Sequence, residues 1–233
     1  MKKLLIASLL VLGGCASPQV VNYTLTPGTD QSPSANASSQ PSRNTSDASR
    51  VMPYKLERVT VPIQTDDLSI VVRDGNDRLL VLTYDRWTVS LSDEFTGALA
   101  LALTDEIGMP PAQSWSSIAT SLPHNELQVD VRRFEMLPGQ SADLTASWHI
   151  KFSHAAKGSS VKLSNVATTT SSNSVTGTSL VISDLTCYAR FSHVAQPGVL
   201  PLVQAQQKNI RLLSQKIAQT LKTGQGVDGV VCQ

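Results

Sequence analysis

Residues 127–152 read LQVDVRRFEMLPGQSADLTASWHIKF, and this stretch decides the fold. In its first half apolar Leu127, Val129 and Val131 alternate with polar residues. Its second half repeats the pattern, with apolar residues at Ala142, Leu144, Ala146, Trp148, Ile150 and Phe152. Pro138-Gly139 between the halves is a strong turn signal. Alternation with a period of two predicts two half-buried strands, joined as a hairpin with one face on a core.

Two segments have helical periodicity instead. The stripe in residues 89–108 consists of Leu91, Phe95, Leu99, Leu103 and Ile107, widened by Ala98 and Ala102. Ser90 with Asp93 can cap its start and Gly108 can end it. A second helix is predicted over about 202–222, with the stripe Val203, Ile210, Leu213, Ile217 and Leu221 and with Lys216 and Lys222 near the negative end of its dipole.

Further strands are predicted at 54–63, 68–73, 79–84, about 161–166 and 180–191, with a short β-like segment at 20–25. Asp74-Gly75-Asn76-Asp77 predicts a turn between two of them. Strands, helix, strands and helix in this order predict an α+β fold. We expect an antiparallel-rich mixed sheet with the helices at about 89–108 and about 202–222 packed on it.

The N-terminus has the three parts of a secretory signal. Lys2 and Lys3 precede an apolar run from Leu4 to Leu12, which is too short to span a bilayer. Leu12-Gly13-Gly14-Cys15 resembles the bacterial lipobox, in which the signal is cut before the Cys and the thiol receives a diacylglyceryl group. We therefore expect a signal peptide at 1–14, and a lipoprotein with S-diacylglycerol and an N-acyl chain such as palmitate on Cys15. An ordinary signal with a chance Cys is the alternative.

Residue 16 bears on sorting between the two membranes. Asp directly after the lipidated Cys usually retains a lipoprotein at the inner membrane, and here the residue is Ala16. The sequence thus favours the periplasmic face of the outer membrane over the inner membrane.

A polar tract separates the start of the mature chain from the main domain. Residues 27–50 contain no Val, Ile, Leu, Met or aromatic residue and are rich in Ser and Pro. Such a tract cannot bury enough apolar area to offset its ordering entropy, so we predict a disordered loop or linker. The predicted organisation is anchor, short tether and first strand at 15–26, this tract at 27–50, and one periplasmic domain at 51–233.

Charge does not indicate a nucleic-acid partner. The chain has 19 Lys and Arg against 18 Asp and Glu, and removal of Lys2 and Lys3 with the signal leaves a net charge near −1. No basic run stands out, so nucleic-acid binding is not expected.

Cys187 and Cys232 are the remaining cysteines. In an oxidising periplasm two leftover thiols favour a disulfide, which would tie the C-terminal tail to the body of the domain. Two buried free thiols are the alternative.

The sequence offers no catalytic or metal-binding constellation. His124, His149, His154 and His193 fit no metal signature. No Ser lies in a Gly-x-Ser-x-Gly setting. Asp66-Asp67 and Asp93-Glu94 are consecutive pairs, which suits solvated or capping residues better than acid/base partners. We expect no enzyme and no cofactor beyond the acyl groups.

The order of motifs is similar to that of a known family, the ABC-type transport auxiliary lipoproteins, or paraquat-inducible lipoprotein C family. The lipobox is followed by Tyr23-Thr24-Leu25, by Val59-Thr60-Val61-Pro62 and by Tyr84-Asp85-Arg86-Trp87 before the first helix. Two strands then match, at 127–134 and 142–148, and a closing helix completes the pattern. The tract at 27–50 and much of 171–197 depart from the family pattern as insertions.

The resemblance implies a non-catalytic partner of an inner-membrane transport system with an MCE-type periplasmic component, thought to move lipids between membranes. Arg86 and Trp87 are the implied partner-binding residues, although Trp87 could simply pack the start of the helix. Self-association as a homo-oligomer stays open. The competing hypothesis is a structural or assembly lipoprotein of another envelope complex, such as a secretion apparatus.

The tether length depends on Tyr23-Thr24-Leu25. If this segment joins the sheet, the tether is only residues 16–21 and the domain lies close to the membrane. Otherwise residues 27–50 belong to the tether and the domain ranges further. The resemblance favours the short tether.

Overall fold

The computed structural model describes residues 18–27, 52–112, 123–155 and 180–233, and in these it has two helices and two mixed sheets. The larger sheet has the strand order β2-β5-β6-β7-β8 and the smaller has the order β1-β4-β3. The bounds are β1 Val21–Tyr23, β2 Tyr54–Leu56, β3 Ser69–Arg73, β4 Leu79–Trp87, α2 Leu91–Ile107, β5 Asn125–Leu137, β6 Ser141–Ala155, β7 Leu180–Val194, α4 Val199–Thr223 and β8 Val231–Cys232. The predicted α+β class is confirmed, with the strands divided between two sheets.

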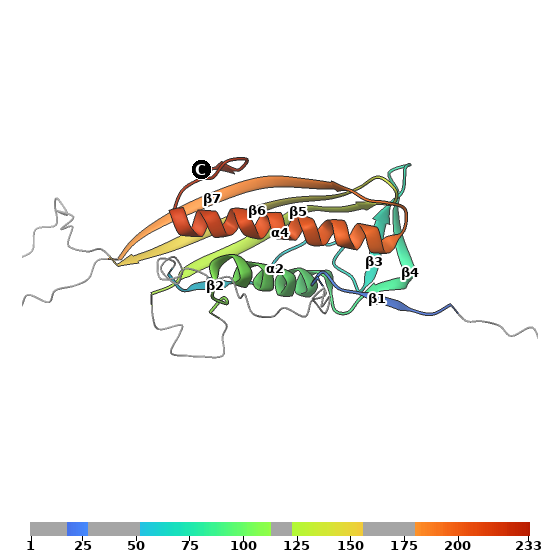
Figure 1. Cartoon of the computed structure of the whole chain (residues 1–233), viewed down its shortest axis with the longest axis horizontal. Helices are drawn as coiled ribbons and strands as arrows, with labels where there is room; N and C mark the ends of the chain where they lie inside the picture. Colours follow the sequence, from blue (N-terminus) through green and yellow to red (C-terminus); the bar gives the residue numbers. More distant parts are fainter. Residues whose placement is uncertain (1–17, 28–51, 113–122, 156–179) are drawn as a thin grey trace, which may run out of the picture.

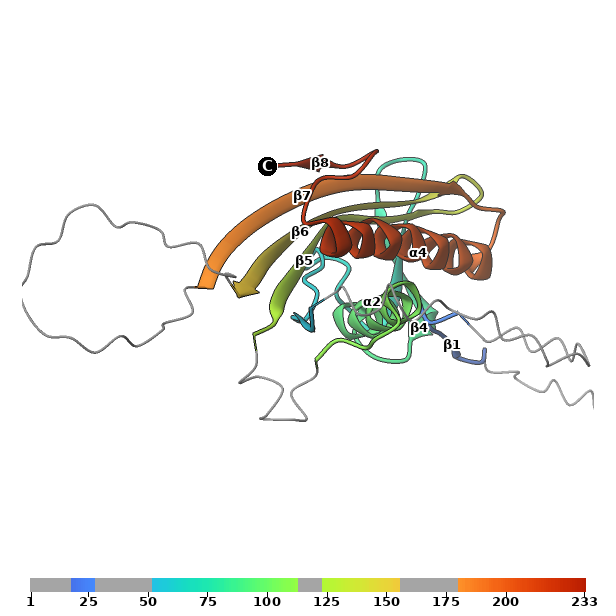
Figure 2. The same cartoon turned by 60° about the vertical axis from the view of Figure 1, so that its left-hand side comes forward.

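The larger sheet is built on the predicted hairpin. β5 and β6 pair antiparallel through the turn at Pro138-Gly139, where Gly139 has a φ of 71°. β7 pairs antiparallel with the whole of β6, and β8 adds two residues to its far edge. The sheet curves over helix α4, and α2 packs against α4 below it (Figures 1 and 2). The smaller sheet lies at one end of this stack, beside the end of β5 (Figure 1).

One register shift in β5 explains its residue pattern. Leu127, Val129 and Val131 face the core, and then the phase changes, so that Phe134 and Met136 are the next buried residues. The shift in the β5–β6 pairing lies between Val131 and Arg133. An extra residue at this bulge restores the same buried face on both sides of it.

Phe134 joins the parts of the core. Its ring lies 6.3 Å, edge to face, from both Trp87 of β4 and Phe95 of α2. All three side chains are buried. The small sheet, the large sheet and α2 thus share one apolar cluster.

Helix α2 begins and ends where the sequence predicts. Ser90 accepts a hydrogen bond from the Asp93 N–H, and Gly108 adopts the left-handed conformation at the C-terminal end. The predicted stripe is buried except for Ala102, which is partly buried.

Helix α4 begins three residues before its predicted start. Pro201 lies in its first turn, where a missing N–H would have no helical partner in any case, so this proline does not delay the helix. Its apolar stripe is buried as predicted, and so are Gln206 and Asn209. The Gln206 amide donates to the carbonyls of Glu135 and Asp143, at 2.9 and 3.2 Å, and Asn209 donates to the Ala142 carbonyl at 2.9 Å. These two amides fix α4 against the turn end of the hairpin.

The predicted strand at 54–63 is wrong in length. Only Tyr54–Leu56 pairs continuously with β5, followed by a single bridge from Thr60 to Asp130. Between them the Val59 N–H donates to the Thr96 hydroxyl of α2 at 3.0 Å, so this residue bonds to the helix rather than to the sheet. The predicted strand at 161–166 and nearly all of the tract at 27–50 lie outside the described residues.

Candidate functional site

The N-terminal segment Val21–Leu25 is part of the fold. β1 pairs parallel with β4, with Val21 opposite Asp85 and Tyr23 opposite Trp87. The Tyr23 hydroxyl donates to the Asp85 carboxylate at 3.0 Å, and the Thr88 N–H donates to the Tyr23 carbonyl at 3.2 Å. Partial burial, and then the neighbouring Asp85 carboxylate, raise the pKa of Tyr23, which keeps the hydroxyl a donor.

One buried carboxylate holds the end of this segment. Glu94, in the first turn of α2, accepts hydrogen bonds from the Thr24 hydroxyl at 2.9 Å and from the Leu25 N–H at 3.1 Å. Its other oxygen accepts from the Thr88 hydroxyl. Glu94 is only 6% exposed, so these donors and the helix N-terminus take the place of water around its carboxylate. The pair Asp93-Glu94 suits solvated or capping residues by sequence. Asp93 does lie at the cap, but Glu94 is buried.

Two further contacts complete the attachment. The Leu25 side chain is fully buried in the main core. The Gln207 amide of α4 donates to the Thr24 carbonyl at 3.0 Å. The segment therefore contacts β4, α2 and α4, as the short-tether alternative requires.

A groove between the two helices begins where this segment ends. It encloses about 640 Å³ and is lined by Leu25–Pro27, by α2 from Ala98 to Glu106 and by α4 from Gln204 to Arg211. Its walls combine apolar residues, such as half-exposed Leu101, with Gln207, Lys208 and Asp105. Walls that combine apolar and polar residues in this way are typical of binding grooves.

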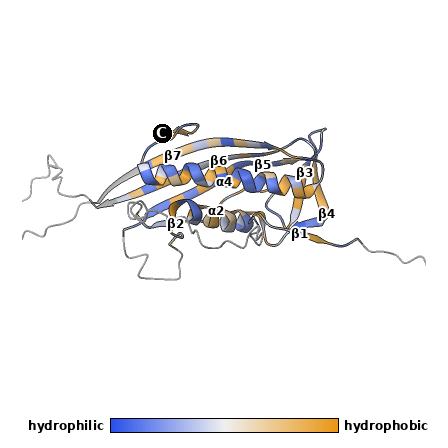
Figure 3. Ribbon diagram, viewed as in Figure 1, coloured by the Kyte–Doolittle hydropathy of each residue, from blue (hydrophilic) through white to orange (hydrophobic). Residues whose placement is uncertain are grey.

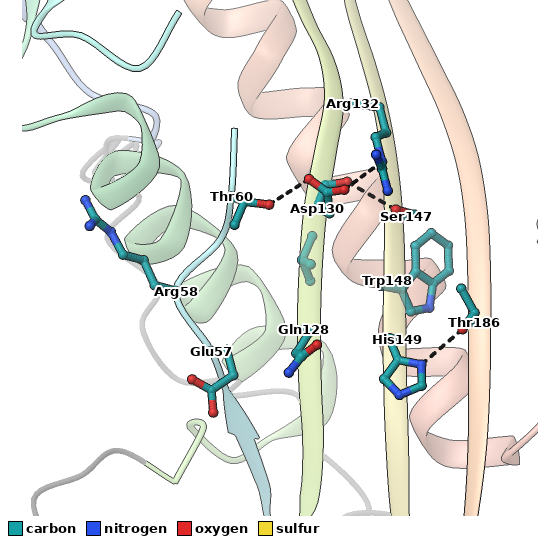
Figure 4. A pocket seen from close by; sticks show the side chains of 11 residues that line it. Glu57, Arg58, Thr60, Gln128, Asp130, Arg132, Ser147, Trp148, His149 and Thr186 are labelled. Atoms are coloured by element: carbon teal, nitrogen blue, oxygen red, sulfur yellow. Dashed lines mark hydrogen bonds and ion pairs between the residues drawn. The ribbon is translucent and has the colours of Figure 1, made fainter. Parts of the chain in front are cut away.

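A second, more open depression of about 520 Å³ lies across β5, β6 and β7, next to the segment Glu57–Thr60 (Figure 4). Asp130 is at its centre, where it accepts from the Thr60 hydroxyl and pairs with Arg132, both at 2.6 Å. His149 and the Thr186 hydroxyl lie 3.0 Å apart on the neighbouring strands. Figure 4 shows Thr60 directed at Asp130, and His149 directed at Thr186, each across to the neighbouring segment.

The contacts of this depression place one hydroxyl beside an imidazole. His149 lies 3.0 Å from the Thr186 hydroxyl through Nδ1 and 3.9 Å from the Asp184 carboxylate through Nε2, and the side chains of His149 and Asp184 are 38% and 61% exposed. Ser147 lies 3.5 Å from the Asp130 carbonyl, a backbone acceptor. His193 bonds to Asn209 at 2.6 Å. In the described parts of the chain no three His, Cys, Asp or Glu residues are close enough to share a metal ion.

The predicted partner-binding residues divide between surface and core. Arg86 is exposed, whereas Trp87 is 2% exposed and packs in the core. Trp87 therefore has the packing role that the sequence left open, and the partner-binding prediction keeps only Arg86 as a surface residue.

The disulfide is present. Cys187 of β7 and Cys232 of β8 are bonded and lie opposite one another in the pairing of the two strands. Cys15 lies outside the described residues. Among those described, neither helix is both long and apolar enough to cross a membrane.

Solved structures of other proteins resemble parts of this chain. One solved structure, of an uncharacterised protein, matches with a TM-score of 0.52 and 14% identity over 73% of this chain and 92% of its own. A protein of the DUF330 family from Xanthomonas campestris matches with a TM-score of 0.44 and 17% identity over 74% of this chain and 85% of its own. A search of curated proteins finds no match.

The family model is the decisive comparison. The model of the ABC-type transport auxiliary lipoprotein component matches residues 34–186, about two thirds of the chain. The match includes α2, which forms one wall of the groove, and β5 and β6, which form the central hairpin; α4 and Leu25–Pro27, the other walls of the groove, lie outside it. The chain belongs to the family of ABC-type transport auxiliary lipoprotein components.

Proposed function

We propose that this chain is a periplasmic lipoprotein that serves an MCE/ABC-type intermembrane transport system as a non-catalytic auxiliary component, with lipids as the cargo of that system. The family match over residues 34–186 carries the proposal. The polar pairs and the mixed groove support a binding role, because they offer surfaces for a protein partner.

The anchor belongs to the same proposal. The signal at 1–14 and the lipobox ending at Cys15 would leave the mature chain held by acyl groups, and several acyl chains give stable attachment where one gives only marginal binding. Ala16 in place of Asp favours the outer membrane.

The docked N-terminal segment supports a short tether. Five residues separate Cys15 from Val21, and a chain of that length extends about 20 Å at most. The domain would then remain close to the membrane, and the partner would have to reach it there.

Metabolic labelling tests the anchor. Cells given an alkyne analogue of palmitate should label the wild-type protein and not the Cys15→Ala variant. Cys232→Ala is the matched control, because it also removes one Cys, and it should keep the label. Label that persists in Cys15→Ala would contradict the assignment.

Crosslinking in cells tests the partner. A photo-crosslinking amino acid at Leu101 in the groove and at Arg86 should capture an MCE-type periplasmic protein. The same group at Val231, exposed on β8, is the control and should capture much less. Capture of secretion-apparatus subunits, with no MCE-type protein, would overturn the proposal in favour of the assembly alternative.

A further inference from the structure

Exposed apolar side chains gather at the end of the domain that carries the smaller sheet. Six of them define a surface that we call the apolar end: Val20, Val21, Leu79, Leu80, Val81 and Tyr84. Each is 41–63% exposed. They belong to β1, to the residue before it and to β4, which lie together at one end of the molecule, and Figure 3 shows strongly hydrophobic residues on these strands.

The pattern in β4 is not that of a strand packed on a core. Leu79, Leu80 and Val81 are consecutive, so they point to alternating faces, yet all three are exposed. Farther along the strand Trp87 is buried, as a core strand requires. The first part of β4 therefore projects beyond the core with apolar residues on both faces, and an exposed apolar surface of this kind marks a site of contact.

β4 is also open along one edge here. β3 pairs with Leu79, Leu80 and Val81, while β1 pairs only with Asp85–Trp87. Among the described residues nothing pairs with the other edge of residues 79–84. Packing among the described residues therefore does not explain why the exposed side chains of the apolar end are hydrophobic.

The chain leaves the domain at the same place. Residues 18–21 are exposed, and Val21 is the first residue of β1. With Cys15 only six residues before Val21, the acyl groups would lie within about 20 Å of the apolar end. With a short tether, contact between the apolar end and the bilayer is effectively intramolecular. The effective concentration of each for the other is on the order of millimolar, so even a weak contact would form.

We propose that the apolar end rests on the lipid bilayer that holds the acyl chains of Cys15. This inference depends on the acyl anchor of the proposed function. Tyr84 suits the headgroup boundary, where aromatic side chains with one polar end are enriched. The turn at the tip of the β3–β4 hairpin carries Asp77, which is 97% exposed at its side chain, and the ion pair of Arg78 with Asp74. These charges remain among the headgroups, so the hairpin lies along the interface and does not enter tip first.

A reporter tryptophan tests the contact. Full-length mature, acylated protein is placed in vesicles of phosphatidylethanolamine and phosphatidylglycerol, with or without bromine on the acyl chains. Val81→Trp and Val231→Trp carry the reporter at two exposed apolar sites, of which only the first lies in the apolar end. Wild-type protein supplies the background of the native tryptophans. We expect brominated lipid to quench the reporter at position 81 at least two-fold more than the reporter at 231.

The outcomes separate the two proposals. Protein that fails to float with the vesicles would lack the anchor, which overturns the proposed attachment. Protein that floats and is quenched equally at 81 and 231 retains its anchor and overturns the apolar-end inference alone. Amide exchange at residues 79–84 that slows as the protein concentration rises, without quenching, would assign the open edge to a strand of a second copy of this chain, and would overturn the lipid contact as well.

Discussion

The carboxylate of Glu94 accepts a hydrogen bond from the backbone N–H of Leu25, 69 residues earlier in the chain, at 3.1 Å. The same carboxylate accepts from the hydroxyls of Thr24 and Thr88. One residue in the first turn of α2 thereby connects the N-terminal segment with the end of β4. Under the proposed acyl attachment, this connection sets how far the domain can move from Cys15.

Replacing Glu94 should release the N-terminal segment. Glu94→Gln removes the charge, and the Thr88 hydroxyl must then accept from the new NH₂ group instead of donating. The bonds from Thr24 and Leu25 become neutral ones, each worth about 1 kcal/mol less than a bond to a charged group. We expect amide exchange at residues 22–26 to become roughly ten-fold faster or more, measured by hydrogen exchange with mass spectrometry.

Glu126→Gln is the matched control, because Glu126 forms an ion pair with Lys151 on the surface of the large sheet. It should leave exchange at 22–26 unchanged. Equal exchange in wild type and Glu94→Gln would show that the segment is held without Glu94.

Removing the disulfide should destabilise the domain without unfolding it. The bond closes a loop of 44 intervening residues, and in the loop-entropy model such a bond contributes roughly 3–4 kcal/mol. Cys232→Ser is the cleaner variant, because Cys187 is buried and Cys232 is only partly so. We expect a Tm about 10 °C lower for a domain of this size, measured by thermal unfolding. A Tm that does not fall on reduction of the wild type would contradict the prediction.

Phe134→Ala should be among the most destabilising single changes. The ring contacts both Trp87 and Phe95, so its removal leaves a cavity between the two sheets and α2. Large-to-small substitution at such a site costs about 3–5 kcal/mol. Denaturant unfolding should show this loss, while Phe191→Ala, at a partly buried position on β7, should cost clearly less. A smaller loss at 134 than at 191 would contradict the central place of Phe134.

Stability should fall above pH 10, in part because of Tyr54. Burial raises the pKa of Tyr54 well above 10.0, its ordinary value. Above pH 10 the unfolded chain loses the phenolic proton and the folded chain keeps it, so each further pH unit removes up to about 1.4 kcal/mol of stability. Tyr54→Phe should flatten this slope. At neutral pH the substitution should lower the free energy of unfolding only slightly, because the Tyr54 hydroxyl that it removes donates only a long hydrogen bond, 3.4 Å, to the Met109 carbonyl. Urea titrations between pH 9 and 11 measure the free energy of unfolding at each pH. If this free energy falls as steeply with pH in Tyr54→Phe as in the wild type, the prediction is contradicted.

Local patterns in the sequence were sufficient to predict the long hairpin and both helices. Alternation identifies β5 and β6, and Ser90 with Gly108 marks the ends of α2. These signals depend on neighbours a few residues apart, and such neighbours are visible in the sequence.

What the sequence missed depends on distant partners. Glu94 looks like a first-turn acid of α2, and only the fold brings Thr24 and Thr88 to it. The strand at 54–63 appears continuous, yet Val59 turns its N–H to Thr96 of α2. The phase change from Val131 to Phe134 was visible in the sequence, and it could have indicated the bulge in β5.

The parallel pairing of β1 with β4 sets how the domain would carry mechanical load. A pull on the N-terminal chain acts along β1, so it would shear the bonds between β1 and β4 together and would not peel them one after another. Just behind this ladder the load reaches the Thr24 and Leu25 bonds to Glu94, and through them the first turn of α2. Under the proposed attachment, tension between the membrane and a bound transport partner would therefore pass through the β1–β4 ladder and then through the carboxylate of Glu94 into the helical layer of the domain.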